Sequence, residues 1–302
     1  MDIKLIPIEV NTKEVTSLAK NEYGEVVESK LDSNFSELLL THELFSAHLT
    51  LHGGHVLSWQ PKGHEEVFWM SKKTQLQQGK AIRGGVPICW PWFGPYNGAG
   101  NHGFARTSIW QLSGIDISSE GIKIELELSG ENCSPSWSYK FSVKQVLMFS
   151  TTFSQQLIIE NLSHKDFQFS NALHSYFSVS NPANIAIPDL NSASFDDKIN
   201  QLLGCAPADV FNCTGPIDKI YHHNSSMTLF DKGWKRAIEI KKSNSAQWVL
   251  WNPGINIAAG MADIHQQGED EFVCLEAANT NWITVAKGEK LSLSQEVQVY
   301  KL

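Results

Sequence analysis

Apolar and polar residues alternate with a period of two in several stretches, and this pattern constrains the fold more than any other feature. Residues 122–128 read Ile-Lys-Ile-Glu-Leu-Glu-Leu, and Leu291, Leu293, Val297 and Val299 share one parity near the end of the chain. Such alternation is typical of a strand with one buried face and one solvent-exposed face. The succession of strands and amphipathic helices that indicates a parallel sheet is not found. We therefore predict an all-β protein, a large antiparallel β-sandwich.

Three segments refine this prediction. Residues 47–59 read as two strands joined by a hairpin turn at Gly53 and Gly54. Residues 34–48 have the composition of one short helix, so we expect a few short helices in the sandwich. The first ~30 residues have the weakest pattern, and we expect them to lie at the periphery because chain termini pack loosely. The sequence shows no repeat and no linker, which predicts a single domain over residues 1–302.

Charge and cysteine usage limit the partners. The chain has 24 basic and 32 acidic residues, a net charge of -8, which argues against a nucleic-acid partner. No stretch of ~18 apolar residues predicts a membrane span. The five cysteines are scattered and never form a C-x-x-C pair, and the first residues do not resemble a secretory signal. These features indicate free thiols in a reducing compartment. We also expect a monomer.

The segment most dense in unusual residues spans 81–95 and is followed by 101–106. Its glycines, prolines and tryptophans predict a long, aromatic loop region, and such loops are commonly functional. Arg83 and Arg106 bracket it. A guanidinium matches the geometry of phosphate, so the two arginines form a candidate anion clamp; the alternative is that they cap loop carbonyl groups. The tryptophans and Phe93 stack on a ligand in one interpretation and pack in the core in the other.

Three further residues are candidates for chemistry. If the strand that starts at Phe167 stays regular, His174 lies on its more polar face, although a lone histidine is more often structural. Glu276 ends a short apolar run, where a carboxylate is costly to bury unless it is paired or its raised pKa is useful. The alternative interpretation is that Glu276 is simply the first exposed residue after a strand and has no role in chemistry. Asp218 is a loop acid whose simpler interpretation is a turn residue.

Motifs of other site classes are missing from the sequence. His52, His55 and the pair at 222–223 fit no zinc-site spacing, so we expect no metal. No G-x-S-x-G motif indicates a serine hydrolase, and no glycine-rich motif indicates a nucleotide site. We therefore expect no cofactor.

Six segments, in order, resemble one known family. They read LHGGHVLSW at 51–59, IRGGVPICWPWFG at 82–94, HGFAR at 102–106, ALHSYF at 172–177, DKIY at 218–221 and CLE at 274–276. These segments, in this order, resemble those of the D-hexose-6-phosphate mutarotases (glucose-6-phosphate 1-epimerases), a branch of the aldose 1-epimerases. The resemblance covers roughly residues 46–299.

The resemblance implies a galactose-mutarotase-like β-sandwich that is metal-free and cytoplasmic. It implies an isomerase that interconverts the α and β anomers of a hexose 6-phosphate, with His174 as general acid and Glu276 as general base. The implied substrate-binding residues are Arg83, Asn101, His102, Arg106 and Asp218. Asn101 stands where the family pattern leads us to expect glutamine, and Lys219 where we expect arginine.

Two other functions are weighed against this one. A mutarotase for unphosphorylated aldoses would not need the two arginines. A non-catalytic sandwich that binds sugar phosphates would not need an acid and a base together. The small-molecule partner is thus a sugar phosphate in the favoured interpretation.

Overall fold

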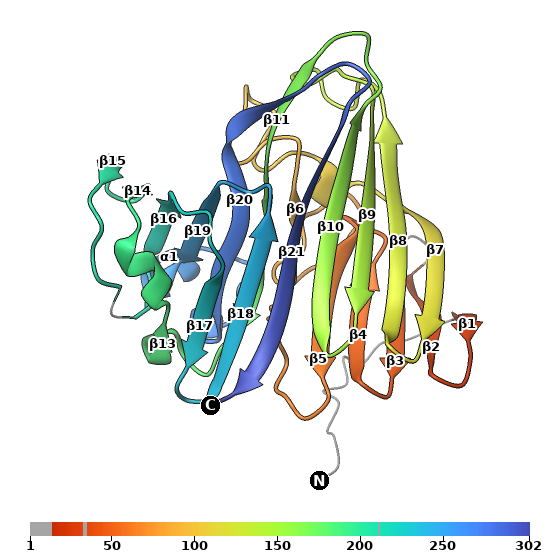
Figure 1. The fold of residues 1–302 in the computed structure, drawn as a ribbon, viewed down its shortest axis with the longest axis horizontal. Helices are drawn as coiled ribbons and strands as arrows, with labels where there is room; N and C mark the ends of the chain where they lie inside the picture. Colours follow the sequence, from red (N-terminus) through yellow and green to blue (C-terminus); the bar gives the residue numbers. More distant parts are fainter. Residues whose placement is uncertain (1–13, 33–34, 211) are drawn as a thin grey trace.

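Antiparallel backbone hydrogen bonds join the strands into three sheets in this computed structural model, which describes residues 14–32, 35–210 and 212–302 (Figure 1). The five-stranded sheet is a meander in chain order: β1 (Glu14–Lys20), β2 (Gly24–Asp32), β3 (Phe35–His42), β4 (Phe45–Thr50) and β5 (His55–Pro61). Its register is continuous from one edge to the other apart from three irregular positions.

A second sheet, here called the back sheet, has the order β13 (Ile185–Ala186), β17 (Met227–Asp231), β18 (Arg236–Ser243), β21 (Lys290–Lys301), β10 (Thr152–Asn161), β9 (Phe141–Phe149), β8 (Gly121–Gly130) and β7 (Gln111–Ser118). Figure 1 shows its long strands β21, β10, β9 and β8 side by side. The crossover that places β21 between β18 and β10 joins the two halves of the sheet.

The third sheet, here called the site sheet, has the order β15 (Leu202–Cys205), β14 (Phe195–Asp197), β16 (Ile217–Tyr221), β19 (Gln247–Asn252), β20 (Phe272–Val285), β11 (Phe167–Leu173) and β6 (Ile88–Cys89). The short strand β12 (Tyr176–Ser178) continues the direction of β11 and also pairs with β20. Strand β20 is therefore central, with β19 on one side and β11 and β12 on the other.

One cluster of buried apolar side chains receives residues from all three sheets, including Leu38, Ile122, Ile124, Leu126, Phe169 and Leu275. The alternation in 122–128 is confirmed, because the isoleucines and leucines of β8 point into this core and the residues between them do not. The antiparallel β-sandwich is thus confirmed as the fold. One departure lies in β21, where Gln295 occupies a buried position among apolar neighbours.

The short helix expected within 34–48 is wrong. Its described residues form the hairpin of β3 and β4, which buries Leu38, Leu40, Phe45, Ala47 and Leu49 between neighbouring strands. Local helix propensity is weak, and the backbone hydrogen bonds and apolar contacts offered by β2 and β5 outweigh it. The hairpin turn at Gly53 and Gly54 is present between β4 and β5, and both glycines have a positive φ.

The first described strand, β1, lies at one edge of the five-stranded sheet. Strands β1 and β2 form an edge hairpin of the five-stranded sheet, and residues 1–13 lie outside the described part. The helices are short: α1 (Gly254–Ala258) and the 3-10 turns η1 (Ala105–Thr107), η2 (Pro182–Asn184), η3 (Pro188–Ser192) and η4 (Gly268–Asp270). Among the described residues, none of these helices is long and apolar enough to cross a membrane.

We expect Gly103→Ala to destabilise the fold more than Gly100→Ala. Both glycines have a left-handed φ, 66° and 86°, so either alanine costs about 1–2 kcal/mol of backbone strain. A Cβ on Gly103 would also lie 1.9 Å from the carbonyl oxygen of Trp90, whereas a Cβ on Gly100 meets no atom within 4 Å. Urea unfolding of both variants measures the difference, and equal losses would contradict the importance of this close approach.

Candidate active site

His174 and Glu276 lie next to each other on the site sheet. Glu276 belongs to β20 and lies opposite Val249 of β19, while His174 lies between β11 and β12. His174 Nε2 is 3.3 Å from Glu276 Oε1. The carboxyl group is almost fully buried, with 1% of Glu276 exposed, and its Oε2 atom has no hydrogen-bond partner among the described residues. A histidine and a carboxyl group in contact within a buried site form a candidate acid–base pair.

Burial shifts the pKa of both members of the pair in the direction that favours their neutral forms. It raises the pKa of Glu276 well above its ordinary value, and nearby Asp218 raises it further, while Arg106 opposes the shift. Burial also lowers the pKa of His174, and the positive charges of Arg106 and Arg83 and the neighbouring His102 add to this effect. The two groups are close enough to titrate as one unit. A proton shared between them is therefore shielded from bulk solvent by the burial of both side chains.

Tyr176 connects His174 to Arg83. Its ring stacks on the imidazole, with ring centroids 4.9 Å apart and an interplanar angle of 17°. Its hydroxyl oxygen accepts a hydrogen bond of 2.8 Å from Arg83 Nη1. Burial raises the pKa of Tyr176, so the hydroxyl stays protonated at neutral pH.

Arg83 is held on its other side by Asp263, whose Oδ2 accepts a 3.0 Å hydrogen bond from the guanidinium Nε. Burial opposes the charge of Arg83, but Tyr176 and Asp263 outweigh this effect and raise its pKa, so the guanidinium stays charged. The backbone after Arg83 approaches other segments closely: a Cβ on Gly85 would lie 2.2 Å from the carbonyl oxygen of Val56. Only glycine fits there with φ at 61°.

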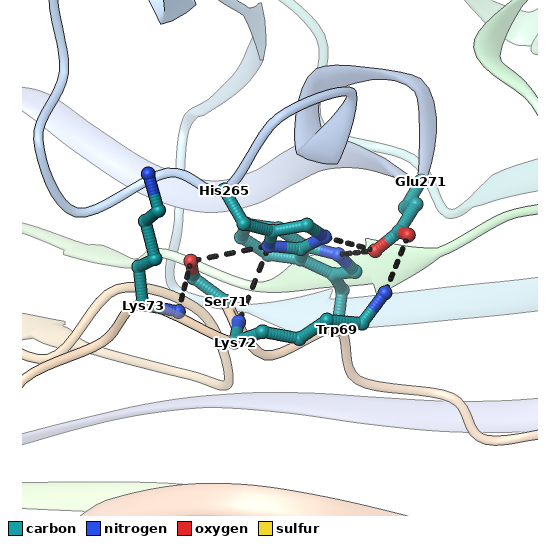
Figure 2. A network of polar contacts seen from close by, with 6 residues as sticks. All are labelled: Trp69, Ser71, Lys72, Lys73, His265 and Glu271. Carbon is teal, nitrogen blue, oxygen red and sulfur yellow. Dashed lines mark hydrogen bonds and ion pairs between the residues drawn. The ribbon is translucent and has the colours of Figure 1, made fainter.

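A polar network fixes the loop that carries Asp263 against the segment before Arg83 (Figure 2). His265 Nε2 donates to Glu271 Oε2 at 2.9 Å, and the same carboxylate accepts hydrogen bonds from Trp69 Nε1 and Lys72 Nζ. His265 Nδ1 accepts a hydrogen bond from the backbone amide of Lys72. Trp69 also stacks with the rings of both His265 and Tyr176, so the network extends to the wall of the site.

The second arginine lies on the loop side of the site. Arg106, in η1, donates through Nη2 to the carbonyl oxygen of Asn101 at 2.9 Å. His102 has a left-handed φ of 66° and its Nδ1 accepts a hydrogen bond from the amide of Gly94. Its ring lies edge-on to His174, with centroids 5.9 Å apart. Burial, together with Arg106 and Arg83, lowers the pKa of His102 to about 3, so this imidazole is neutral.

Asp218 completes the charged groups. It lies on β16, opposite Trp251 of β19, rather than in a turn. Burial raises its pKa. A cavity of 260 Å³ brings His174, Glu276 and the two arginines together; it is lined by Arg83, Phe93, Asn101, His102, Arg106, His174, Tyr176, Asp218, Val249, Trp251, Met261 and Glu276.

All seven residues singled out from the sequence thus line one cavity. Sequence reasoning missed Trp251 and Met261 in its wall and Asp263 behind Arg83. The alternation within β19 could have indicated Trp251, because Trp251 lies on the same face of the strand as Val249, which also lines the cavity. Met261 and Asp263 lie in a loop, where no sequence pattern indicates them. Trp90 and Trp92 pack in the core and not on the cavity, as the core interpretation predicts.

A larger cavity of 510 Å³ lies elsewhere, lined by Tyr96, Ser136, Trp137, Tyr139, Asp166, Gln168, Trp282 and Thr284. It contains none of the seven residues, and its polar groups form no acid–base pair. Within the described ranges, no three His, Cys, Asp or Glu side chains are grouped as metal ligands. The smaller cavity is therefore the candidate active site, lined by the candidate acid–base pair and by two arginines.

Known proteins resemble this chain in sequence. The family model for aldose 1-epimerase matches residues 36–298. A protein of Escherichia coli K12, provisionally named glucose-6-phosphate 1-epimerase, is 32% identical over 270 residues, which cover 87% of this chain and 90% of that protein.

Solved structures show the same fold. A crystal structure from Salmonella typhimurium, described as a provisional mutarotase, is 31% identical with a TM-score of 0.84, covering 92% of this chain and 94% of that one. A galactose mutarotase-like protein from Clostridium acetobutylicum shares only 16% identity, yet its TM-score is 0.75, covering 93% of this chain and 100% of that one. The sequence and the fold agree: the chain belongs to the aldose 1-epimerase family.

Proposed function

We propose that this protein is a mutarotase that interconverts the α and β anomers of hexose 6-phosphates, with glucose 6-phosphate as a substrate. The observation that carries the proposal is the contact of His174 with Glu276, 3.3 Å apart, in a cavity that also holds two arginines. The names of the relatives support the same substrate class. The activity fits the cytoplasm, where sugar phosphates are retained, and requires one chain only.

The proposed reaction opens and recloses the sugar ring. Glu276 takes the proton of the hydroxyl group on C1. The electron pair of that O–H bond then forms the carbonyl double bond between the oxygen and C1. The bond between C1 and the ring oxygen breaks, and His174 protonates that oxygen. The open aldehyde rotates about the bond from C1 to C2, and the reverse transfers close the ring on the other face. No group is oxidised or lost, so these two side chains are sufficient.

The arginines give the proposal its substrate class. A phosphate carries a charge between -1.5 and -2 at neutral pH and accepts charge-assisted hydrogen bonds from guanidinium groups. Arg83 is fixed by Asp263 and Tyr176, whereas the Nε atom of Arg106 is buried without a partner among the described residues. Asn101, His102 and Asp218 are left to position the sugar.

Phosphate binding would also prepare the acid–base pair. In the free protein, the arginine charges help to keep His174 neutral. A bound dianion offsets these charges, which raises the pKa of His174 and favours the protonated imidazole that the proposed reaction uses as its acid; the same offset of Arg106 raises the pKa of Glu276. The ionised pair of imidazolium and carboxylate holds the same number of protons as the neutral pair, so the two forms interconvert by a proton transfer within the pair. Unphosphorylated aldoses lack this effect and fit the site less well.

Glu276→Gln is expected to lower the rate of anomer exchange by about 10²–10⁴-fold, because the amide cannot accept the proton. Exchange spectroscopy by NMR on α- and β-glucose 6-phosphate measures the rate above the spontaneous one. Glu37→Gln is a matched control: Glu37 is also buried and lies 3.2 Å from a histidine, His48, outside the cavity. Full activity of the Glu276 variant would refute the mechanism.

Arg106→Met is expected to raise KM for glucose 6-phosphate about 10–100-fold, because a hydrogen bond to a charged group contributes about 1.5–3 kcal/mol. The KM for free glucose should stay unchanged, because glucose has no phosphate group for Arg106 to bind. Initial rates with both sugars test this. Equal changes for the two sugars, or none, would argue against an anion clamp and for a site built for neutral aldoses.

The same variant should move the pH profile of kcat/KM upward on both sides. Arg106 lowers the pKa of Glu276 and that of His174, so its removal lets both pKa values rise. The acidic limb, where the base becomes protonated, and the basic limb, where the acid loses its proton, then shift to higher pH. The substrate phosphate titrates in both proteins, so the difference between the profiles reports the enzyme. A downward shift would contradict the assigned electrostatics.

A further inference from the structure

Three glutamines lie in the apolar core of the sandwich. Gln145 of β9, Gln155 of β10 and Gln295 of β21 are 0%, 0% and 1% exposed. They occupy inward positions of the back sheet, where the neighbouring strands place leucine, isoleucine, valine or phenylalanine. Burying an amide without full hydrogen bonding is unfavourable, so three amides in one core require a specific arrangement.

The side chains form one continuous chain of hydrogen bonds between the sheets. Ser175 Oγ donates to Gln295 Oε1 at 3.0 Å, and Gln295 Nε2 donates to Gln155 Oε1 at 2.8 Å. Gln155 Nε2 donates to Gln145 Oε1 at 2.7 Å, and Gln145 Nε2 donates to the carbonyl oxygen of Gly54 at 2.7 Å. We call these five residues the glutamine chain.

The direction of the glutamine chain is fixed at one end. The Gly54 carbonyl can only accept a hydrogen bond, so Gln145 must present its Nε2 there and its Oε1 to Gln155. The same constraint passes to Gln155 and Gln295. Ser175 must then donate its hydroxyl proton to Gln295. Hydrogen bonds aligned in this way strengthen one another in a low-dielectric core.

Each end of the glutamine chain adjoins the candidate active site. Ser175 lies between His174 and Tyr176, and its carbonyl oxygen accepts a hydrogen bond from Leu275, the neighbour of Glu276. Since side chains alternate along extended backbone, Ser175 points into the core while its two neighbours line the cavity. At the other end, the turn that contains Gly54 touches Arg106: a Cβ on Gly53 would lie 2.6 Å from the Arg106 carbonyl oxygen.

We propose that the glutamine chain is a positioning device that holds the imidazole of His174 in place against Glu276. It acts from the core through Ser175, and it ties the backbone of His174 to the turn that packs against Arg106. Proton transfer is sensitive to such placement, and a shift of about 1 Å can cost about 10²-fold in rate. This inference rests on the proposed function for its catalytic consequence, but its structural consequence can be measured without substrate.

The test replaces Gln155, the middle residue, which does not line the cavity. Gln155→Leu keeps a similar volume and breaks the glutamine chain on both sides. Gln156→Leu is the matched control, since Gln156 is the next residue of β10 and is exposed. Three quantities are measured in the full-length protein: kcat and KM for glucose 6-phosphate below the unfolding transition, the Tm, and the imidazole NMR signals of His174, assigned by comparison with His174→Gln.

We expect Gln155→Leu to lower kcat about tenfold, to change KM less than about twofold, and to shift the His174 signals. Gln156→Leu should behave as the wild type. A lower Tm with unchanged kcat and unchanged His174 signals would overturn the proposal, because the glutamines would then only stabilise the fold. Equal effects of the two substitutions would overturn it as well.

Ser175→Ala covers the case in which Gln155→Leu does not fold. It removes only the terminal donor, and we expect the same loss in kcat and the same shift of the His174 signals; an unchanged enzyme would overturn the proposal. If the wild-type protein fails to accelerate anomer exchange, the proposed function is wrong. The His174 signals of the variants still decide whether the glutamine chain positions the imidazole.

Discussion

The burial of the Glu276 carboxyl group on the central strand of the site sheet is the constraint on which the rest of the site depends. A carboxylate removed from water is unstable unless other groups compensate it. Here burial raises the pKa of Glu276, Arg106 opposes that shift, and His174 lies in contact with the carboxyl group. The same environment lowers the pKa of His174. The protein thus holds a pair whose proton can move with little change in net charge, which suits a reaction that takes one proton and returns another.

The site sheet positions the candidate acid–base pair, and the loops supply the positive charge. The sheet register fixes Glu276 beside β19, whereas Arg83 and Arg106 lie in irregular segments that need close approaches and left-handed conformations. Such segments are held by tertiary contacts. Asp263 and Tyr176 orient Arg83, and the network of Figure 2 fixes the loop of Asp263 in turn. In the proposed function, this division lets one rigid sheet carry the chemistry while the loops select a phosphorylated sugar.

The core of the sandwich is more than an apolar filling between sheets. Its apolar cluster joins all three sheets, but the glutamine chain crosses it from Ser175 to Gly54. Apolar packing tolerates small displacements, because dispersion contacts have no preferred direction. Hydrogen bonds between amides, in contrast, have a preferred direction. A directional chain behind the site is therefore suited to fix the angle of a side chain that non-directional packing would leave less defined.

The sequence by itself determined the strands and the order of the segments that carry the site. The period of two in residues 122–128 is a local property of the pleated backbone, and the grouped glycines before and after Trp90 mark irregular backbone with positive φ, which glycine favours. Tertiary structure alone decided the hairpin at β3 and β4, where strand pairing overrides helix propensity. It also decided which residues from distant strands meet: Asp218 opposite Trp251, Asp263 against Arg83, and three glutamines in line. The physical reason is that alternation with a period of two determines only which face of the sheet a side chain lies on. It does not determine the register between strands, and the register sets which side chains meet in the site.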